Sequence, residues 1–364
     1  MNSIRSFSLL LLAVIIFAPF GFAEPRAPFK VGVILPLTGG LADFGVAAKN
    51  GFELARKEHP EVLKNIEFLI DDSQYDSNKA LSSFQKFRSA GDVSLTYVWG
   101  YGPNQAVLPV SETQKFPVIA ISGERSMTAG KKYSLRFCYH IEMIATTLLD
   151  YARSQKLNRL GVIKAELAYM DGLLDYMQKN LREGESLEVL DSYQTQDSTF
   201  KNSIAKLKTK QFDALAVFLV GGQISQFYKE MKQMNVLIPT IGTDFYDSMK
   251  LVNDAQGTMT GSVFAGPSVE PAFVERYVKV YGNDAQVAWA ANSYEFALLT
   301  GKLFNSSTTQ ISAEEILARY RSLKGEHGEA ARYSYDESAA GSGFDFKVVA
   351  RMVERHHIAD LDLH

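Results

Sequence analysis

Four apolar stretches in the first third of the chain are each followed by a loop and then by a helix-like segment. These stretches are predicted strands at residues 30–35, 66–70, 93–98 and 117–121. Uninterrupted apolar runs are typical of strands that are covered on both faces. Strand–helix units at regular spacing connect through right-handed crossovers, which places their strands in one parallel sheet. The chain is therefore predicted to be an α/β protein.

The same alternation starts again after residue 140. Further strands are predicted at residues 160–164, 187–192, 214–220 and 240–241, and they alternate with helices at 141–154, 172–181 and 200–208. The last third is predicted to hold helices at 272–281, 287–304 and 313–322, and strand-like segments around 332–335 and 344–353. A chain of 364 residues commonly divides into two domains. Two α/β sheets in succession fit that expectation.

Residues 1–23 have the features of a cleaved secretory signal peptide. Arg5 is the only charged residue of this segment, and the apolar core at 9–20 is too short for a comfortable membrane span. An exported protein is therefore expected. No cysteine lies near the cleavage site, so no lipid anchor is expected, and the single Cys138 is expected to be a buried, inert thiol. The formal net charge of −3 gives no electrostatic case for nucleic-acid binding.

Loops rich in glycine and polar residues follow several predicted strands. The loop at 36–44 would lie at the carboxyl end of the first strand, and the loops at 99–104, 122–126 and 242–247 would lie at the ends of later strands. Open α/β sheets bind ligands at this edge, where backbone N–H groups are exposed. The alternative is an ordinary strand–helix turn without a ligand, and the loop at 36–44 alone does not decide between the two.

Several segments, in their order and spacing, resemble one family. They read VGVILPLTGGLADFG, IDDSQYDSNKA, PVIAIS, LGVIKAELAYMDGL, GTDFYDS and YSYDESAAGSGFDF. Together they resemble the type I periplasmic substrate-binding proteins of ABC importers, in the branched-chain amino-acid (Leu/Ile/Val)-binding branch, over residues 29–355. The resemblance implies two lobes, each a mainly parallel sheet flanked by helices, joined by three crossing segments and closing on a ligand by a hinge. Lobe 1 would comprise residues 24–140 and 266–338, lobe 2 would comprise 141–265 and 339–364, and the crossings would lie near 139–142, 265–268 and 339–343.

The resemblance also implies a set of ligand-binding residues. Phe44 would pack on the ligand, Asn104 would donate a hydrogen bond, and Tyr169 would be an aromatic clamp from the second lobe. Asp244 would accept a hydrogen bond from the α-ammonium group. A zwitterion that leaves water needs donors for its carboxylate and an acceptor for its ammonium group.

The segment that would bind the ligand carboxylate departs from the family pattern. It reads Ser122, Gly123 and Glu124 here, and Glu124 stands where a hydroxyl is expected. A second carboxylate would repel the ligand unless Arg125 pairs with Glu124 or becomes the partner of the anion. The region at 220–222 also lacks the tyrosine that relatives often place there. A polar amino acid, an amide or another small organic ligand therefore remains open beside a branched-chain amino acid.

The leading functional hypothesis is a monomeric, non-enzymatic receptor that passes a small ligand to an inner-membrane ABC permease. A ligand sensor for a membrane signalling partner is a second hypothesis. An exported α/β hydrolase that uses Glu124 and Asp244 is a third, although the chain has no GxSxG, GxGxxG or HExxH motif. No cofactor is expected. No metal is expected either, because the pair His356 and His357 has no cysteine or carboxylate partner at a recognisable spacing.

Overall fold

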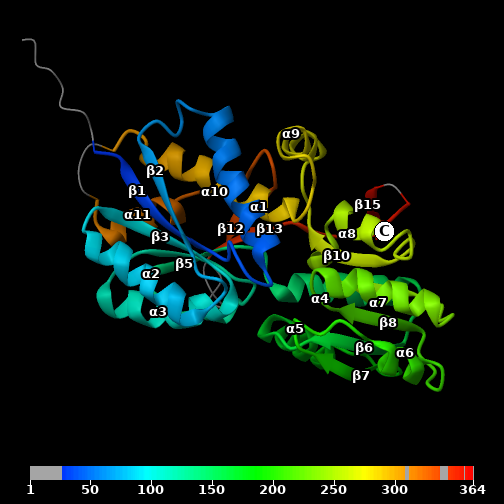
Figure 1. Ribbon diagram of the computed structural model, residues 1–364. Coiled ribbons are helices and arrows are strands. Elements are labelled where there is room, and N and C mark those ends of the chain that lie inside the picture. Colours follow the sequence, from blue (N-terminus) through cyan, green and yellow to red (C-terminus); the bar gives the residue numbers. More distant parts are fainter. Residues whose placement is uncertain (1–26, 308–310, 337–342, 356, 364) are drawn as a thin grey trace, which may run out of the picture.

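Two α/β lobes lie side by side in this protein (Figure 1). The structure is a computed structural model, and it describes residues 27–307, 311–336, 343–355 and 357–363. One lobe is built on an eight-stranded sheet and the other on a seven-stranded sheet. Helices flank both sheets, so the predicted two-lobed α/β fold is confirmed.

The first sheet is mainly parallel. Its strands are β1 (Phe29–Leu35), β2 (Ile66–Asp72), β3 (Val93–Trp99), β4 (Val118–Ile121), β5 (Ser134–Phe137), β11 (Glu326–His327), β12 (Tyr333–Asp336) and β13 (Gly343–Phe346). The spatial order is β11-β12-β13-β5-β4-β3-β1-β2, and only β12 pairs with its neighbours in the antiparallel direction. Helices of this lobe are α1 (Ala42–Glu58), α2 (Ser77–Ala90), α3 (Tyr101–Gln114), α9 (Pro271–Tyr281), α10 (Val287–Phe304) and α11 (Ala313–Arg321).

Both faces of the first sheet are covered by apolar side chains. On one face α1 and α10 pack against each other and against the sheet, where Phe52, Tyr97 and Phe296 form an aromatic cluster. On the other face α2 and α3 cover a separate core that contains Phe84 and Val98. Continuous apolar strands are the expected consequence of burial on two faces.

The second sheet follows the same plan. Its strands are β6 (Arg159–Ala165), β7 (Ser186–Tyr193), β8 (Ala214–Phe218), β9 (Thr240–Gly242), β10 (Val263–Pro267), β14 (Val348–Val353) and β15 (Ile358–Leu361). The order is β15-β14-β10-β9-β8-β6-β7, with antiparallel pairing only at β14. Its helices are α4 (Ile141–Ser154), α5 (Ala168–Lys179), α6 (Lys201–Leu207), α7 (Gly222–Gln233) and α8 (Met249–Asp254).

The chain passes between the two sheets three times: after β5, after β10 and after β13. The first two passages lie close to the crossings implied by the resemblance. The third differs, because β13 pairs with β5 and β12 in the first sheet and the chain changes sheets only at Lys347. The resemblance had implied that residues 343–346 belong to the second lobe. Residues 339–342 of the predicted crossing lie outside the described residues.

Local boundaries show two further differences. Helix α1 begins at Ala42, inside the loop that the sequence predicted at 36–44, and the N-cap of α2 is Asp76, whose carboxylate accepts a hydrogen bond from Lys79 N at 2.8 Å. The short elements β11, α8 and β15 were not predicted, because two to six residues carry no readable periodicity.

The structure bears on the prediction for Cys138 and does not describe the predicted signal peptide. Cys138 is fully buried, and burial raises the pKa of its thiol, which agrees with the predicted inert cysteine. Residues 1–23, the predicted signal peptide, lie outside the described residues. Among the helices of the described ranges, none has the length and apolar character needed to cross a membrane.

Candidate ligand-binding site

A narrow cavity lies between the lobes, at the carboxyl ends of strands from both sheets. Its first-lobe wall comes from the loops after β1 to β4 and from the start of α10, and its second-lobe wall comes from the loops after β6 and β9. About 50 Å³ is open to the centres of water molecules, so the cavity has room for only a few of them. The lobes are therefore nearly closed on each other.

Aromatic rings dominate the wall of this cavity. They belong to Tyr75, Trp99, Tyr101, Tyr169, Phe245 and Trp289. The rings of Trp99 and Trp289 lie 5.1 Å apart between centroids, and those of Tyr169 and Phe245 are stacked at 5.6 Å. Such pairs are preferred aromatic geometries, so the wall is ordered by its own contacts.

Phe44 lies one layer behind this wall. It is 3% exposed, and its ring packs on Trp99, Phe245 and Trp289. The contact with Phe245, at 4.8 Å between centroids, joins the first lobe to the second. The predicted role of Phe44 as a ligand contact stays a prediction, and in this closed arrangement the side chain supports the residues that line the cavity.

Two glycines allow the loops of the cavity wall to pack directly against neighbouring side chains. Gly100 has φ +99°, and a Cβ atom there would lie 2.4 Å from the ring of Tyr75. A Cβ atom on Gly123 would lie 2.7 Å from a methyl group of Ile141, at the start of the second lobe. Larger residues at either position would push the walls apart.

Asp244 lies behind the second-lobe wall and is 2% exposed. The hydroxyl of Tyr139 donates to its Oδ2 at 2.8 Å, and the hydroxyl of Tyr169 donates to its Oδ1 at 2.7 Å. Burial raises the pKa of Asp244 to about 6, and the two tyrosine hydrogen bonds oppose that rise. Each oxygen of Asp244 thus accepts one tyrosine hydrogen bond, and its predicted contact with a ligand ammonium group stays a prediction. Asp244 does not line the cavity beside Glu124, so the paired-carboxylate hydrolase finds no support in this geometry.

Glu124 is the carboxylate that does line the cavity. It is partly buried, and its side chain has no hydrogen-bond or ion-pair partner among the described residues. A Cβ atom on Gly172 of α5 would lie 2.6 Å from its Oε1, so the carboxylate reaches the second lobe. Burial, together with the charge of Glu142, raises the pKa of Glu124 to about 7.

Two predicted site residues lie elsewhere. The amide of Asn104 is fully buried and donates to the carbonyl oxygens of Val98 and Gly100, both at 2.8 Å, so it fixes the turn after β3. Arg125 forms an ion pair with Asp336 of β12, and it does not pair with Glu124. Neither side chain lines the cavity. The structure therefore gives no support to the alternative in which Arg125 pairs with Glu124, and a role of Arg125 as the anion partner stays a prediction.

The structure thus brings Ser122, Gly123, Glu124 and Tyr169 to the cavity, as the resemblance implied. Sequence reasoning missed most of the aromatic wall. The segment after β3, which contains Trp99 and Tyr101, was recognised as a strand-end loop, and its aromatic residues were a usable signal. Trp289 begins a helix far along the chain, and only the topology brings it to this edge.

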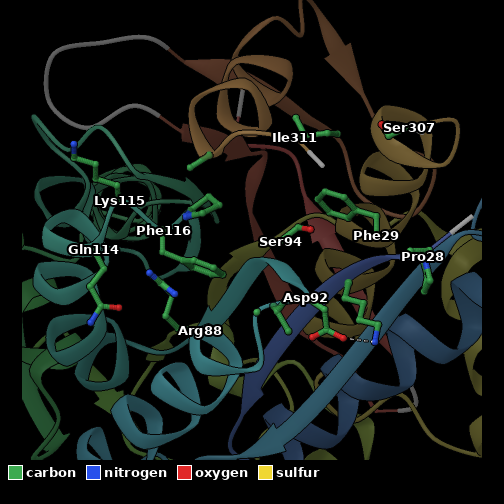
Figure 2. A pocket seen from close by; sticks show the side chains of 16 residues that line it. Pro28, Phe29, Arg88, Asp92, Ser94, Gln114, Lys115, Phe116, Ser307 and Ile311 are labelled. Carbon is green, nitrogen blue, oxygen red and sulfur yellow. Dashed lines mark hydrogen bonds and ion pairs between the residues drawn. The ribbon is translucent and has the colours of Figure 1, made fainter. Parts of the chain in front are cut away.

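A second hollow, of about 610 Å³ by the same measure, lies at the opposite edge of the first sheet. Figure 2 shows the side chains of Arg88, Asp92, Gln114 and Phe116 around it. These residues flank the amino ends of β3 and β4, whereas α/β sheets bind ligands at the carboxyl ends. None of the predicted site residues lines this hollow.

One group of side chains has the composition of a metal site. The ligand atoms of Glu58, His59 and Glu329 lie within 4.8 Å of one another. Arg276 forms ion pairs with both glutamates, at 3.1 and 3.7 Å, and the hydroxyl of Tyr294 donates to Glu58 at 2.8 Å. The carboxylates therefore already have cationic and hydrogen-bonding partners, and the group is a surface network.

Two α/β lobes with a cavity between them, joined by a chain that passes between them three times, form the fold of type I periplasmic binding proteins. The chain belongs to the periplasmic binding protein family, whose model matches residues 28–341. A curated relative, the Leu/Ile/Val-binding protein BraC3 of Rhizobium johnstonii, is 22% identical over 285 residues, which is 73% of this chain and 74% of the relative.

Solved structures show the same fold. The leucine-binding protein LivK of Thermotoga maritima has a TM-score of 0.80 at 20% identity, covering 92% of this chain and 98% of its own. A solute-binding protein of an ABC transporter from Rhodopseudomonas palustris, in complex with 3,4-dihydroxybenzoic acid, has a TM-score of 0.80 at 20% identity, covering 93% and 98%.

Proposed function

We propose that this protein is a periplasmic receptor that encloses a small organic ligand between its lobes and delivers it to an ABC importer in the inner membrane. The observation that carries the proposal is the cavity at the carboxyl edges of both sheets, whose walls come from both lobes. A ligand that contacts both walls binds the closed arrangement better than the open one, and it shifts the equilibrium by that difference.

The relatives support this proposal. The curated relative is named for leucine, isoleucine and valine, and a structural neighbour is an ABC-transporter protein with a small aromatic acid bound. The proposal includes no catalytic step, so the ligand leaves the protein chemically unchanged. A single chain presents both walls, and a monomer is sufficient for binding.

The test begins with the protein purified from its native periplasm. Mass spectrometry after denaturation identifies the released ligand, and thermal unfolding with the ligand added back measures binding. A ligand at about 100 times its Kd adds roughly 2.7 kcal/mol to the free energy of unfolding. Absence of any released ligand, together with no thermal shift across a broad panel of small molecules, would contradict the proposal.

A matched pair of variants locates the site. Ser122→Phe fills the cavity between the lobes, and Ser94→Phe places the same side chain in the hollow of Figure 2. We expect the first variant to lose the ligand and the second to keep it, with both proteins folded by circular dichroism. Loss in Ser94→Phe alone would move the site to the opposite edge of the sheet.

A further inference from the structure

Glu124 is an acceptor without a donor. Its carboxylate lies in the wall of the cavity, partly removed from water, and no described side chain or backbone N–H donates to it. Two basic side chains close to Glu124 in the sequence have other partners: Arg125 pairs with Asp336, and His140 Nδ1 lies 2.9 Å from Glu142. An ionised carboxylate that loses water without gaining a partner is unfavourable, so a cationic ligand at this position would stabilise the ionised form.

The surroundings of Glu124 favour a cation over a neutral donor. The same cavity is lined by rings from Tyr75, Trp99, Tyr169 and Trp289. The faces of aromatic rings carry partial negative charge and attract organic cations, most strongly where water is excluded. Among the described residues of the lining, Glu124 is the only charged side chain, and no lysine or arginine is present. The described wall is therefore aromatic with one acidic group, and it holds no cationic side chain to pair with a ligand anion.

The indole N–H of Trp99 favours a ligand that also carries a hydrogen-bond acceptor. The Nε1 of Trp99 is buried without a hydrogen-bond acceptor among the described residues, although the side chain lines the cavity. Buried donors are normally paired, and an unpaired one is costly. A ligand with a hydroxyl or carbonyl oxygen near its cationic group would provide both missing partners.

We propose that this site takes an organic ammonium ion, primary to quaternary, whose positive group lies between Glu124 and the aromatic rings and which carries no carboxylate beside that group. The inference rests on the proposed function, because it names the ligand class of the same cavity. It separates this chain from the relatives whose names specify leucine, isoleucine and valine or an aromatic acid, since all of those ligands carry a carboxylate.

The test uses matched probes on the full mature protein after removal of bound ligand by dialysis. Calorimetry at pH 8 compares choline with 3,3-dimethylbutan-1-ol, which has the same shape without the charge. Methylammonium and phenethylammonium vary the size of the cation, and leucine and benzoate supply carboxylates. The same titrations are repeated on Glu124→Gln and on the control Glu61→Gln, which changes an exposed glutamate outside the cavity lining.

We expect at least one ammonium probe to bind ten times or more tightly than its uncharged counterpart, as a charge-assisted contact would give. Glu124→Gln should remove that preference and Glu61→Gln should keep it. Binding of leucine or benzoate without binding of any ammonium probe would overturn this inference and leave the proposed function intact. An ammonium preference that survives in Glu124→Gln would also overturn it. No binding of any probe and no ligand released from native protein would contradict the proposed function itself.

Discussion

Each lobe brings one carboxylate to the region of the cavity, and the two carboxylates differ in whether the protein provides them with hydrogen-bond donors. Asp244 in the second lobe is almost fully buried and accepts hydrogen bonds from Tyr139 and Tyr169. Glu124 in the first lobe lines the cavity, and within the described ranges it has no partner. Burial raises the pKa of both groups, but only Asp244 has donors that oppose the rise.

This contrast separates a carboxylate that the protein itself supplies with donors from one that it leaves without a described partner. The donors of Asp244 are tyrosine hydroxyls of the chain. Glu124 has no such donor among the described residues, and the proposed ammonium ligand would be its partner. The resemblance to the family implied the reverse arrangement, with ammonium recognition at Asp244 and carboxylate recognition at the segment that contains Glu124.

Removing the donors of Asp244 should have the largest effect. The double variant Tyr139→Phe, Tyr169→Phe leaves a buried carboxylate without donors, and it should lose about 3–5 kcal/mol of unfolding free energy at pH 8. The loss should be smaller at pH 5, because the pKa of Asp244 already exceeds its ordinary value of 3.8 and would rise further, so the carboxyl group protonates.

Urea unfolding at pH 8 and pH 5 measures the loss of unfolding free energy in the double variant. Tyr101→Phe is the control, since the Tyr101 hydroxyl contacts only the exposed side chain of Gln105 among the described residues, and it should change stability by less than about 0.5 kcal/mol. A double variant that behaves like this control would remove the distinction between the two carboxylates.

Ligand binding should depend on the ionisation of Glu124. With a pKa of about 7, Glu124 is mostly protonated at pH 6 and mostly ionised at pH 8. An ammonium ligand should therefore bind about tenfold more weakly at pH 6 than at pH 8, which corresponds to about 1.4 kcal/mol. Calorimetry with choline at the two pH values measures the ratio. A flat profile in the wild-type protein, equal to that of Glu124→Gln, would contradict this assignment.

Ionisation of Glu124 should lower the stability of the folded protein, whereas ionisation of a paired glutamate raises it. The folded-state pKa of about 7 lies above the ordinary 4.5, so ionisation weakens the folded state as pH rises through 7. Glu124→Gln should therefore gain stability relative to the wild-type protein between pH 5 and pH 8, by about 1 kcal/mol after allowance for solvent screening. Urea midpoints at the two pH values test it. A variant that is less stable at pH 8 would mean that Glu124 has a stabilising partner.

The smallest effect is expected at Arg125. Its ion pair with Asp336 is partly exposed, so Arg125→Gln should cost less than about 1 kcal/mol and leave ligand affinity unchanged. Thermal unfolding and calorimetry measure the two quantities. A tenfold loss of affinity would return Arg125 to the site, as one sequence alternative allowed.

The sequence predicted the fold well because apolar strands and amphipathic helices are local patterns. It located the cavity edge for the same reason, since Ser122 and Tyr169 follow predicted strands. It could not show that the donors of Asp244 come from Tyr139 and Tyr169, because those contacts depend on how three separate segments pack. Asn104 illustrates the same limit: the residue type suits a ligand donor, and only the structure shows that backbone carbonyls occupy its amide.

The most direct test of the central claim is the pKa of Glu124 itself, with and without a cation. Carbon-13 NMR of protein labelled at the glutamate carboxyl groups, with Glu124→Gln for assignment, follows the titration in both states. We predict a pKa of about 7 in the free protein and a clear fall when the cavity is saturated with an ammonium ligand. An ordinary pKa of Glu124 in the free protein, unchanged when the ligand is added, would contradict the claim that Glu124 binds a cationic ligand.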